Sequence, residues 1–362
     1  MVIKMERSTA NPIKEYYIAY LDILGYKAFF KEHKEDISSF LDRIDDAIKR
    51  TAKHISTINS SPILRNIGSI QINAKAFSDN ILLCMEAGES SYEPMRILAF
   101  LQVISDIQRG FVTGYGLFLR GGIKRGCLSM NSDYVFGQGL IDVVEIEEKE
   151  AIYPRIIVDE KLAQYVRGIS FHTQEQMDEA VRIANRIRLQ QPVSDEDMNQ
   201  LNDLAFRVQL GVYMQFAANN LIWRWDDGLC FVNYLQIIDP IHMFGNSAVE
   251  ALMNQLQTVS PFDYELVTKP SIEQDAFLQQ NKIRIEEQLR HHSHYSDIDI
   301  ADGEKATRIA EAREKVLKKY IWAMAYHNRF CTNAKKTNYC INTECNCDTR
   351  FLRTVINVIA ST

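Results

Sequence analysis

The sequence contains no uninterrupted apolar run of about 18 residues, which is the length that a membrane-spanning helix needs. Its first residues also lack the apolar core of a secretory signal peptide. Positive charge is not in excess, because the formal net charge is −6, so there is no broad basic surface for DNA or RNA phosphates. We therefore expect a cytoplasmic protein that binds neither membranes nor nucleic acids.

Paired CxxC motifs, which mark many zinc and redox sites, are also absent. The number of cysteines is odd, and a chain of this length does not depend on disulfides. The seven are Cys84, Cys127, Cys230, Cys331, Cys340, Cys345 and Cys347. The last four lie near His327 in the sequence, so a structural metal is one interpretation, but their spacing favours reduced thiols. Three of the eight histidines, at 291, 292 and 294, form a run that we expect to be solvated.

The chain does have enough apolar material for a core, since 46% of its 362 residues are hydrophobic. Apolar runs predict strands at 16–23, 70–77, 81–87, 117–128, 155–159, 221–226 and 229–238. Helical spacing of apolar residues predicts helices at 35–57, 92–113, 140–150 and 305–330, and a largely helical stretch at 160–219. This order predicts an α+β protein.

The pattern also suggests how the chain divides. A helical insertion at 168–217 separates two parts of one sheet domain, 15–167 and 218–240, and a helical region follows at 241–362. An Asp-Gly hairpin signal at 227–228 indicates that the sheet resumes after the insertion. We expect the insertion to contribute to dimer contacts and regulation.

Two acids stand where strands end. Asp22 closes the first strand, and Gly25 follows in a turn that opens a helix, so the backbone amides there can point at phosphate oxygens. Asp79 lies at the tip of the 70–87 hairpin. Either acid alone is typical of a turn or a helix cap. If the hairpin lies beside the first strand, however, the two carboxylates can share a pair of metals for phosphoryl transfer.

Four motifs resemble class III adenylyl and guanylyl cyclases, in order, over residues 15 to 160. They are Asp-Ile-Leu-Gly-Tyr at 22–26, Lys75 four residues before Asp79, Arg-Gly-Gly-Ile-Lys-Arg-Gly at 120–126, and Tyr-Val-Phe-Gly at 134–137 before a helix containing Glu147. The resemblance implies a cyclase-like (ferredoxin-like palm) antiparallel sheet with helices. It also implies two Mn²⁺ or Mg²⁺ ions per site, and a homodimer with sites at its interface.

The resemblance assigns roles to single residues. Asp22, Ile23 and Asp79 would hold the metals. Leu24, Gly25 and Tyr26 would hold the phosphates. The base would be contacted by Lys75 and Tyr134 of the partner subunit.

The chain also departs from the family pattern. Ile141 and Glu145 stand where the family has an Asn and an Arg, and Tyr134 replaces an Asp that reads purines. The candidates for the missing transition-state cation are Arg125, Arg155 and Arg224.

The opening Leu-Asp-Ile-Leu-Gly-Tyr, the Phe-Ser-Asp hairpin and the Tyr-Pro-Arg-Ile strand resemble the bacterial pyrimidine cyclases of Pycsar antiphage defence. This implies conversion of UTP, or of CTP, into a 3′,5′-cyclic monophosphate that a separate effector protein reads. An inactive nucleotide sensor or scaffold on the same fold is the main alternative. A palm-type nucleotidyltransferase that joins two nucleotides, and a helical interaction protein, are two others.

Overall fold

A mixed eight-stranded sheet lies at the centre of the computed structural model, which describes residues 12–27, 29, 38, 42, 45, 46, 49, 70–89, 93–131, 134–168, 170, 173–237, 272–293 and 303–342. The strands are β1 (Lys14–Leu24), β2 (Ile72–Phe77), β3 (Asn80–Glu86), β4 (Phe118–Met130), β5 (Val135–Phe136), β6 (Ile156–Val158), β7 (Ile222–Arg224) and β8 (Cys230–Val232). Their order is β2-β3-β1-β4-β6-β8-β7, and β5 pairs with β4. Only β4 and β6 among these neighbours run parallel.

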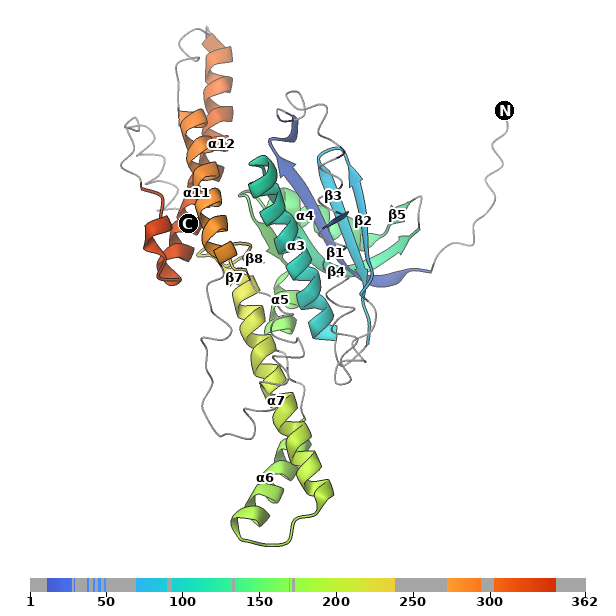
Figure 1. Ribbon diagram of the computed structural model, residues 1–362. Helices are drawn as coiled ribbons and strands as arrows, with labels where there is room; N and C mark the ends of the chain where they lie inside the picture. The colour runs from blue at the N-terminus through green and yellow to red at the C-terminus, as the bar shows by residue number, and fades with distance from the viewer. Residues whose placement is uncertain are drawn as a thin grey trace, which may run out of the picture.

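Helices cover both faces and one end of this sheet (Figure 1). They are α3 (Glu93–Tyr115), α4 (Gln138–Lys149), α5 (Glu160–Arg167), α6 (Gln174–Arg188), α7 (Asp195–Leu221), α11 (Ile272–Ser293) and α12 (Gly303–Asn333). The predicted α+β class is confirmed, and every predicted strand has a counterpart. Most of the helix predicted at 35–57 lies outside the described residues. The two strands after the insertion are shorter than predicted. β8 ends early because the chain leaves the sheet after Val232 to bury Tyr234 and Leu235 beneath α11 and α12.

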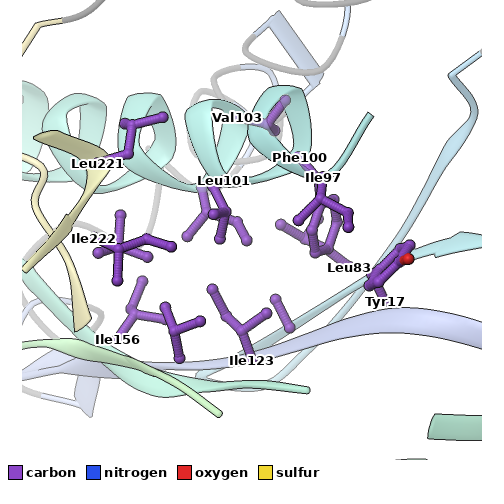
Figure 2. Close-up of a cluster of buried hydrophobic side chains, with 14 of the residues drawn as sticks. Tyr17, Leu83, Ile97, Phe100, Leu101, Val103, Ile123, Ile156, Leu221 and Ile222 are labelled. Carbon is purple, nitrogen blue, oxygen red and sulfur yellow. The ribbon is translucent and has the colours of Figure 1, made fainter. Parts of the chain in front are cut away.

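The main core lies between the sheet and α3. Side chains alternate along a strand, and the β1 residues Tyr17, Leu21 and Ile23 on this face are almost completely buried. Figure 2 shows Ile97, Phe100 and other residues of α3 directed toward the sheet. Apolar residues at helical spacing over 92–113 predicted this helix, and these apolar residues form its buried face.

The opposite face carries α4, which crosses β4 very closely. A Cβ built on Gly139 would lie 2.5 Å from Cδ1 of Ile18 and 3.0 Å from the Cα of Gly126. A Cβ on Gly122 would lie 2.7 Å from Ile146. The glycines of the 120–126 motif therefore let a helix lie directly on the strand, as a glycine within a strand often does.

The helical insertion projects from the sheet as an antiparallel pair, α6 and α7 (Figure 1). Capping boxes start both helices, with Thr173 paired to Gln176 and Ser194 to Asp197. The last turns of α7 pack in the main core and lead directly into β7. The domain limits themselves stay predictions.

The C-terminal helices form a second core with the β7–β8 end of the sheet. Its centre is aromatic: Trp322 stacks on Tyr326 with ring centroids 5.4 Å apart, and Phe231 lies 5.2 Å from Tyr326. The expected solvation of the histidine run is wrong for His292. Its ring is half-buried and stacks on Tyr320 with centroids 5.5 Å apart, and burial lowers its pKa to about 4.

No helix in the described part of the chain is both long enough and apolar enough to cross a bilayer. Those cysteines that the structure describes are all unbridged.

Candidate functional site

The first half of the site is the strand, turn and helix start predicted at 22–26. β1 ends at Leu24, Gly25 turns with φ of +84°, and the next described residues are helical. The N–H of Phe29 donates to the carbonyl of Gly25 at 3.1 Å, which marks the first helical turn. A residue with a side chain is strained at this φ, so glycine is needed for the turn. The amides at this helix start are suited to an anion.

The second half is the β2–β3 turn, and it lies beside Asp22. Phe77 pairs with Asn80 across the turn, and Asn80 pairs with Asp22. The N–H of Ile23 donates to the carbonyl of Asp79 at 2.9 Å. Ser78, just before Asp79, has φ of +58°, an unfavourable conformation for a residue other than glycine. The predicted approach of the two acids is therefore present in the backbone.

Tyr20 shows that the acids share one environment. It lies on the same sheet face as Asp22, since the two residues are two positions apart on β1. Burial raises the pKa of Tyr20, and the negative charges of Glu147, Asp22 and Asp79 raise it further. One phenol is thus within electrostatic reach of four carboxylates, the fourth being that of Glu148.

Arg120 connects two of these carboxylates. It is the β4 residue opposite Asp22, and its Nε donates to Oδ2 of Asp22 at 2.7 Å. Its Nη2 lies 2.7 Å from Oε1 of Glu147 on α4, in a contact whose geometry does not make a hydrogen bond. Glu147 is only 5% exposed, and burial raises its pKa despite the attraction of Arg120. A cation therefore lies at the proposed metal acid in this structure.

A second cation comes from the C-terminal region. Lys319 of α12 is half-buried, and its charge interacts with Arg120, Asp22 and Glu147. Burial lowers its pKa, the nearby Arg120 lowers it further, and the two carboxylates oppose this shift.

The two predicted base-binding residues meet at a different place from the acids. Nζ of Lys75 donates to the carbonyl of Asn131 at 2.8 Å, and the N–H of Tyr134 donates to the Asn131 side chain at 2.8 Å. Asn131 follows the last residue of β4, whereas Arg120 lies near its start. The structure thus brings Lys75 and Tyr134 together, but it holds them apart from the Asp22–Arg120 pair.

The three candidate transition-state arginines all lie elsewhere. Arg125 is five positions from Arg120 on β4, so its side chain is on the opposite sheet face, where it pairs with Glu15. Arg155 is 2% exposed and is held by Asp227. Its guanidinium also lies 5.4 Å from the Tyr153 and Trp322 ring centres.

Arg224 is on the edge strand β7, where it bonds Glu160 at 2.6 Å and the carbonyl of Gly228 at 2.7 Å. These arginines support the fold, and none of them faces Asp22.

A cleft of about 420 Å³ lies beside α4, but its charge does not suit a nucleotide. Five carboxylates line it with only two lysines, and neither Asp22 nor Asp79 is among its residues. The lining residues are Lys124, Asp142, Glu145, Ile146, Lys149, Glu150, Ile157, Val158, Asp159, Glu160, Leu229 and Cys230. Glu145, at the position of the family's Arg, belongs to this cleft and pairs with Lys149, whereas Ile141 is exposed.

Few side chains in the described part of the chain are placed to bind a metal together. Among residues that the structure describes, no three His, Cys, Asp or Glu side chains gather as a ligand set. At the C-terminal thiols, His327 uses one ring nitrogen for Asn281 and the other for the carbonyl of Tyr339. Burial raises the pKa of Cys331 to about 12, so its thiol favours the protonated form. Cys345 and Cys347 lie outside the described residues.

Sequence reasoning assigned no role to Arg120, Glu147 or Lys319. Arg120 and Glu147 both stand inside recognised motifs, so the motif spacing was a usable signal. Lys319 is almost 300 residues from Asp22 and carries no local signal. Its position follows only from how α12 packs.

No family model and no curated protein matches the sequence. Among solved structures, the chain is similar to that of the adenylyl cyclase CyaB from P. aeruginosa, at 12% identity and a TM-score of 0.31. The similarity covers 44% of this chain and 83% of the other chain.

Proposed function

We propose that this chain is a nucleotidyl cyclase of the class III type, with the palm-like arrangement of that family. The observation that carries the proposal is the convergence of Asp22 and Asp79 beside the Gly25 turn. One of these acids lies at the end of β1, the other lies in the adjacent β2–β3 turn, and the Gly25 turn opens a helix whose amides suit phosphate. Such an arrangement would put a metal donor set and an anion site next to each other.

The residues present fit a divalent metal. Mn²⁺ or Mg²⁺ prefers oxygen donors, and the chain offers the carboxylates of Asp22 and Asp79 with the backbone of Ile23. Bound there, two such ions would activate the ribose 3′-hydroxyl and neutralise the triphosphate. Arg120 pairs with both Asp22 and Glu147. It would therefore keep Glu147 as a partner if Asp22 bound a metal.

The chain's own residues orient the substrate for an in-line reaction. The 3′ oxygen attacks the α-phosphorus, its proton is lost, and pyrophosphate leaves with the α–β bridging oxygen. The Leu24, Gly25 and Tyr26 segment would hold the phosphates through backbone N–H groups. The mechanism needs no histidine base.

We propose a homodimer in which each site uses both subunits. Lys75 and Tyr134 of one protomer are apart from its own Asp22, so they suit the site of a second copy. Phe77, on the same face as Asp22 and beside Tyr20, is 47% exposed, and such an apolar side chain fits a buried interface.

The substrate we propose is a pyrimidine nucleoside triphosphate, UTP before CTP. Tyr134 stands where an acid would read a purine, and this favours a smaller base. The cyclic product would act in antiphage defence through a separate effector protein.

The experiment is to incubate the purified protein with Mn²⁺ and each of the four ribonucleoside triphosphates in turn. We expect cyclic UMP or cyclic CMP together with pyrophosphate, and no product from the Asp79→Asn variant. Mass spectrometry separates a cyclic mononucleotide from a dinucleotide, which would indicate the nucleotidyltransferase alternative.

The ion pair between Arg120 and Asp22 favours one other function, a nucleotide sensor that does no chemistry. In that case one triphosphate binds but none is turned over. Calorimetric binding measured beside the turnover assay separates these two functions.

A further inference from the structure

The C-terminal helix α12 is fixed against the same end of the sheet that carries the acids. Leu24 of β1 pairs with Phe118 of β4, and Leu24 packs against the cluster that contains Phe118 and α12. Tyr320 of α12 packs on Phe118 with ring centroids 5.6 Å apart. Two residues further along each strand, on the same face, are Asp22 and Arg120. The helix therefore lies directly beside the proposed metal acid.

Burial on both sides holds Lys319 at this place. Leu317, Tyr320, Ile321 and Trp322 are all buried, so this part of α12 cannot move away from the sheet without opening the core. Lys319 itself is half-buried. Within the described parts of the chain its ammonium makes no hydrogen bond or ion pair with another residue, although it is within electrostatic reach of three charged groups.

A half-buried ammonium without a bonded partner is unfavourable, because it loses water without gaining an anion. The two nearby carboxylates, Asp22 and Glu147, are already engaged by Arg120. A bound polyphosphate would give Lys319 the anion that it lacks. Lysine is also a common phosphate binder, acting as a compact point charge.

We propose that Lys319 is a substrate-binding residue that contacts the phosphate chain at the Asp22 site. This rests on the proposed function, and it makes the C-terminal helical region part of the active site. The position would complement the Leu24–Tyr26 amides by adding a full positive charge. It also supplies a cation that Arg125, Arg155 and Arg224 do not.

The test uses the full-length protein and three variants: Lys319→Met, Lys319→Arg and the control Lys318→Met. Lys318 is the neighbouring lysine; its side chain is 44% exposed, and it pairs with Glu314 on its own helix at 2.8 Å. The first measurement is calorimetric binding of inorganic tripolyphosphate with Mn²⁺. The second is KM and kcat for UTP and CTP.

For Lys319→Met we expect tripolyphosphate affinity to fall at least about ten-fold and KM to rise by a similar factor. Lys319→Arg should recover most of the affinity, and Lys318→Met should stay within two-fold of wild type. The Lys319→Met protein should melt no lower than wild type, because it loses an unpaired charge.

Unchanged tripolyphosphate binding by folded Lys319→Met would overturn the proposal, as would failure of the wild type to bind tripolyphosphate. A wild type that binds it through Lys319 but cyclises no nucleotide would leave this site standing and remove the cyclase function. If instead the enzyme cyclises nucleotides and its kinetics are unchanged in Lys319→Met, the cyclase function stands and the role of Lys319 is refuted.

Discussion

Replacing Asp22 by Asn separates a structural role from a catalytic role. The carboxylate is 17% exposed and Arg120 is 24% exposed, so the change weakens a partly buried ion pair. Charge-assisted hydrogen bonds contribute about 1.5–3 kcal/mol. Arg120 keeps Glu147, and the Asn oxygen can still accept from Nε, so we expect the lower end, about 1.5 kcal/mol. In a chain of this size that lowers Tm by about 2 °C.

Activity should fall far more than stability does. A metal that loses a charged ligand loses several kcal/mol of transition-state stabilisation, and about 3 kcal/mol already corresponds to more than 100-fold in rate. The assay is cyclic product formation with Mn²⁺, run beside thermal unfolding of the same preparation.

The matched control is Asp142→Asn. Asp142 of α4 pairs with Lys124 of β4 at 3.0 Å, and the two side chains are 27% and 32% exposed. This pair resembles Asp22–Arg120 in burial and also involves β4, since it joins that strand to α4. It does not lie in the proposed metal site. We expect a similar small loss of Tm and activity within about three-fold of wild type. Retention of more than a tenth of the activity by Asp22→Asn, or an equal loss in the control, would refute the reasoning.

Three further outcomes are expected. Gly139→Ala should destabilise the fold by about 1–3 kcal/mol, because its Cβ would meet Ile18 at 2.5 Å, whereas Gly110→Ala, with open space at its Cβ, should be neutral or stabilising in denaturant titrations. His327 has its pKa lowered by burial to about 4, so its stabilising contribution is complete above about pH 6.5 and is lost toward pH 4. The stability slope over that window, up to about 1.4 kcal/mol per pH unit, should become shallower in His327→Gln, and an unchanged slope would contradict this assignment. Arg224→Ala should keep kcat within about two-fold of wild type, since this residue lies on the edge strand β7 and pairs with Glu160. A large loss of kcat would show that Arg224 belongs to the active site after all.

Local patterns in the sequence determined most of the elements and the two acids. Period-two and helical spacing of apolar residues report which side of an element is buried, so β1, the β2–β3 hairpin and α3 were predictable. Gly25 marked its turn because a positive φ favours glycine. The proximity of Asp22 and Asp79 was also within reach, since a short hairpin pairing with the first strand brings its tip to that strand's end.

Only the tertiary structure decided which charges surround the acids. Strand register places Arg120 opposite Asp22 and turns Arg125 to the other face, and a shift of one residue would reverse this. Helix packing decides the rest: α12 brings Lys319 to a site almost 300 residues away, while Arg155 is buried against Trp322. Register and helix packing come from the summed contacts of a whole core, and no short stretch of sequence contains that information.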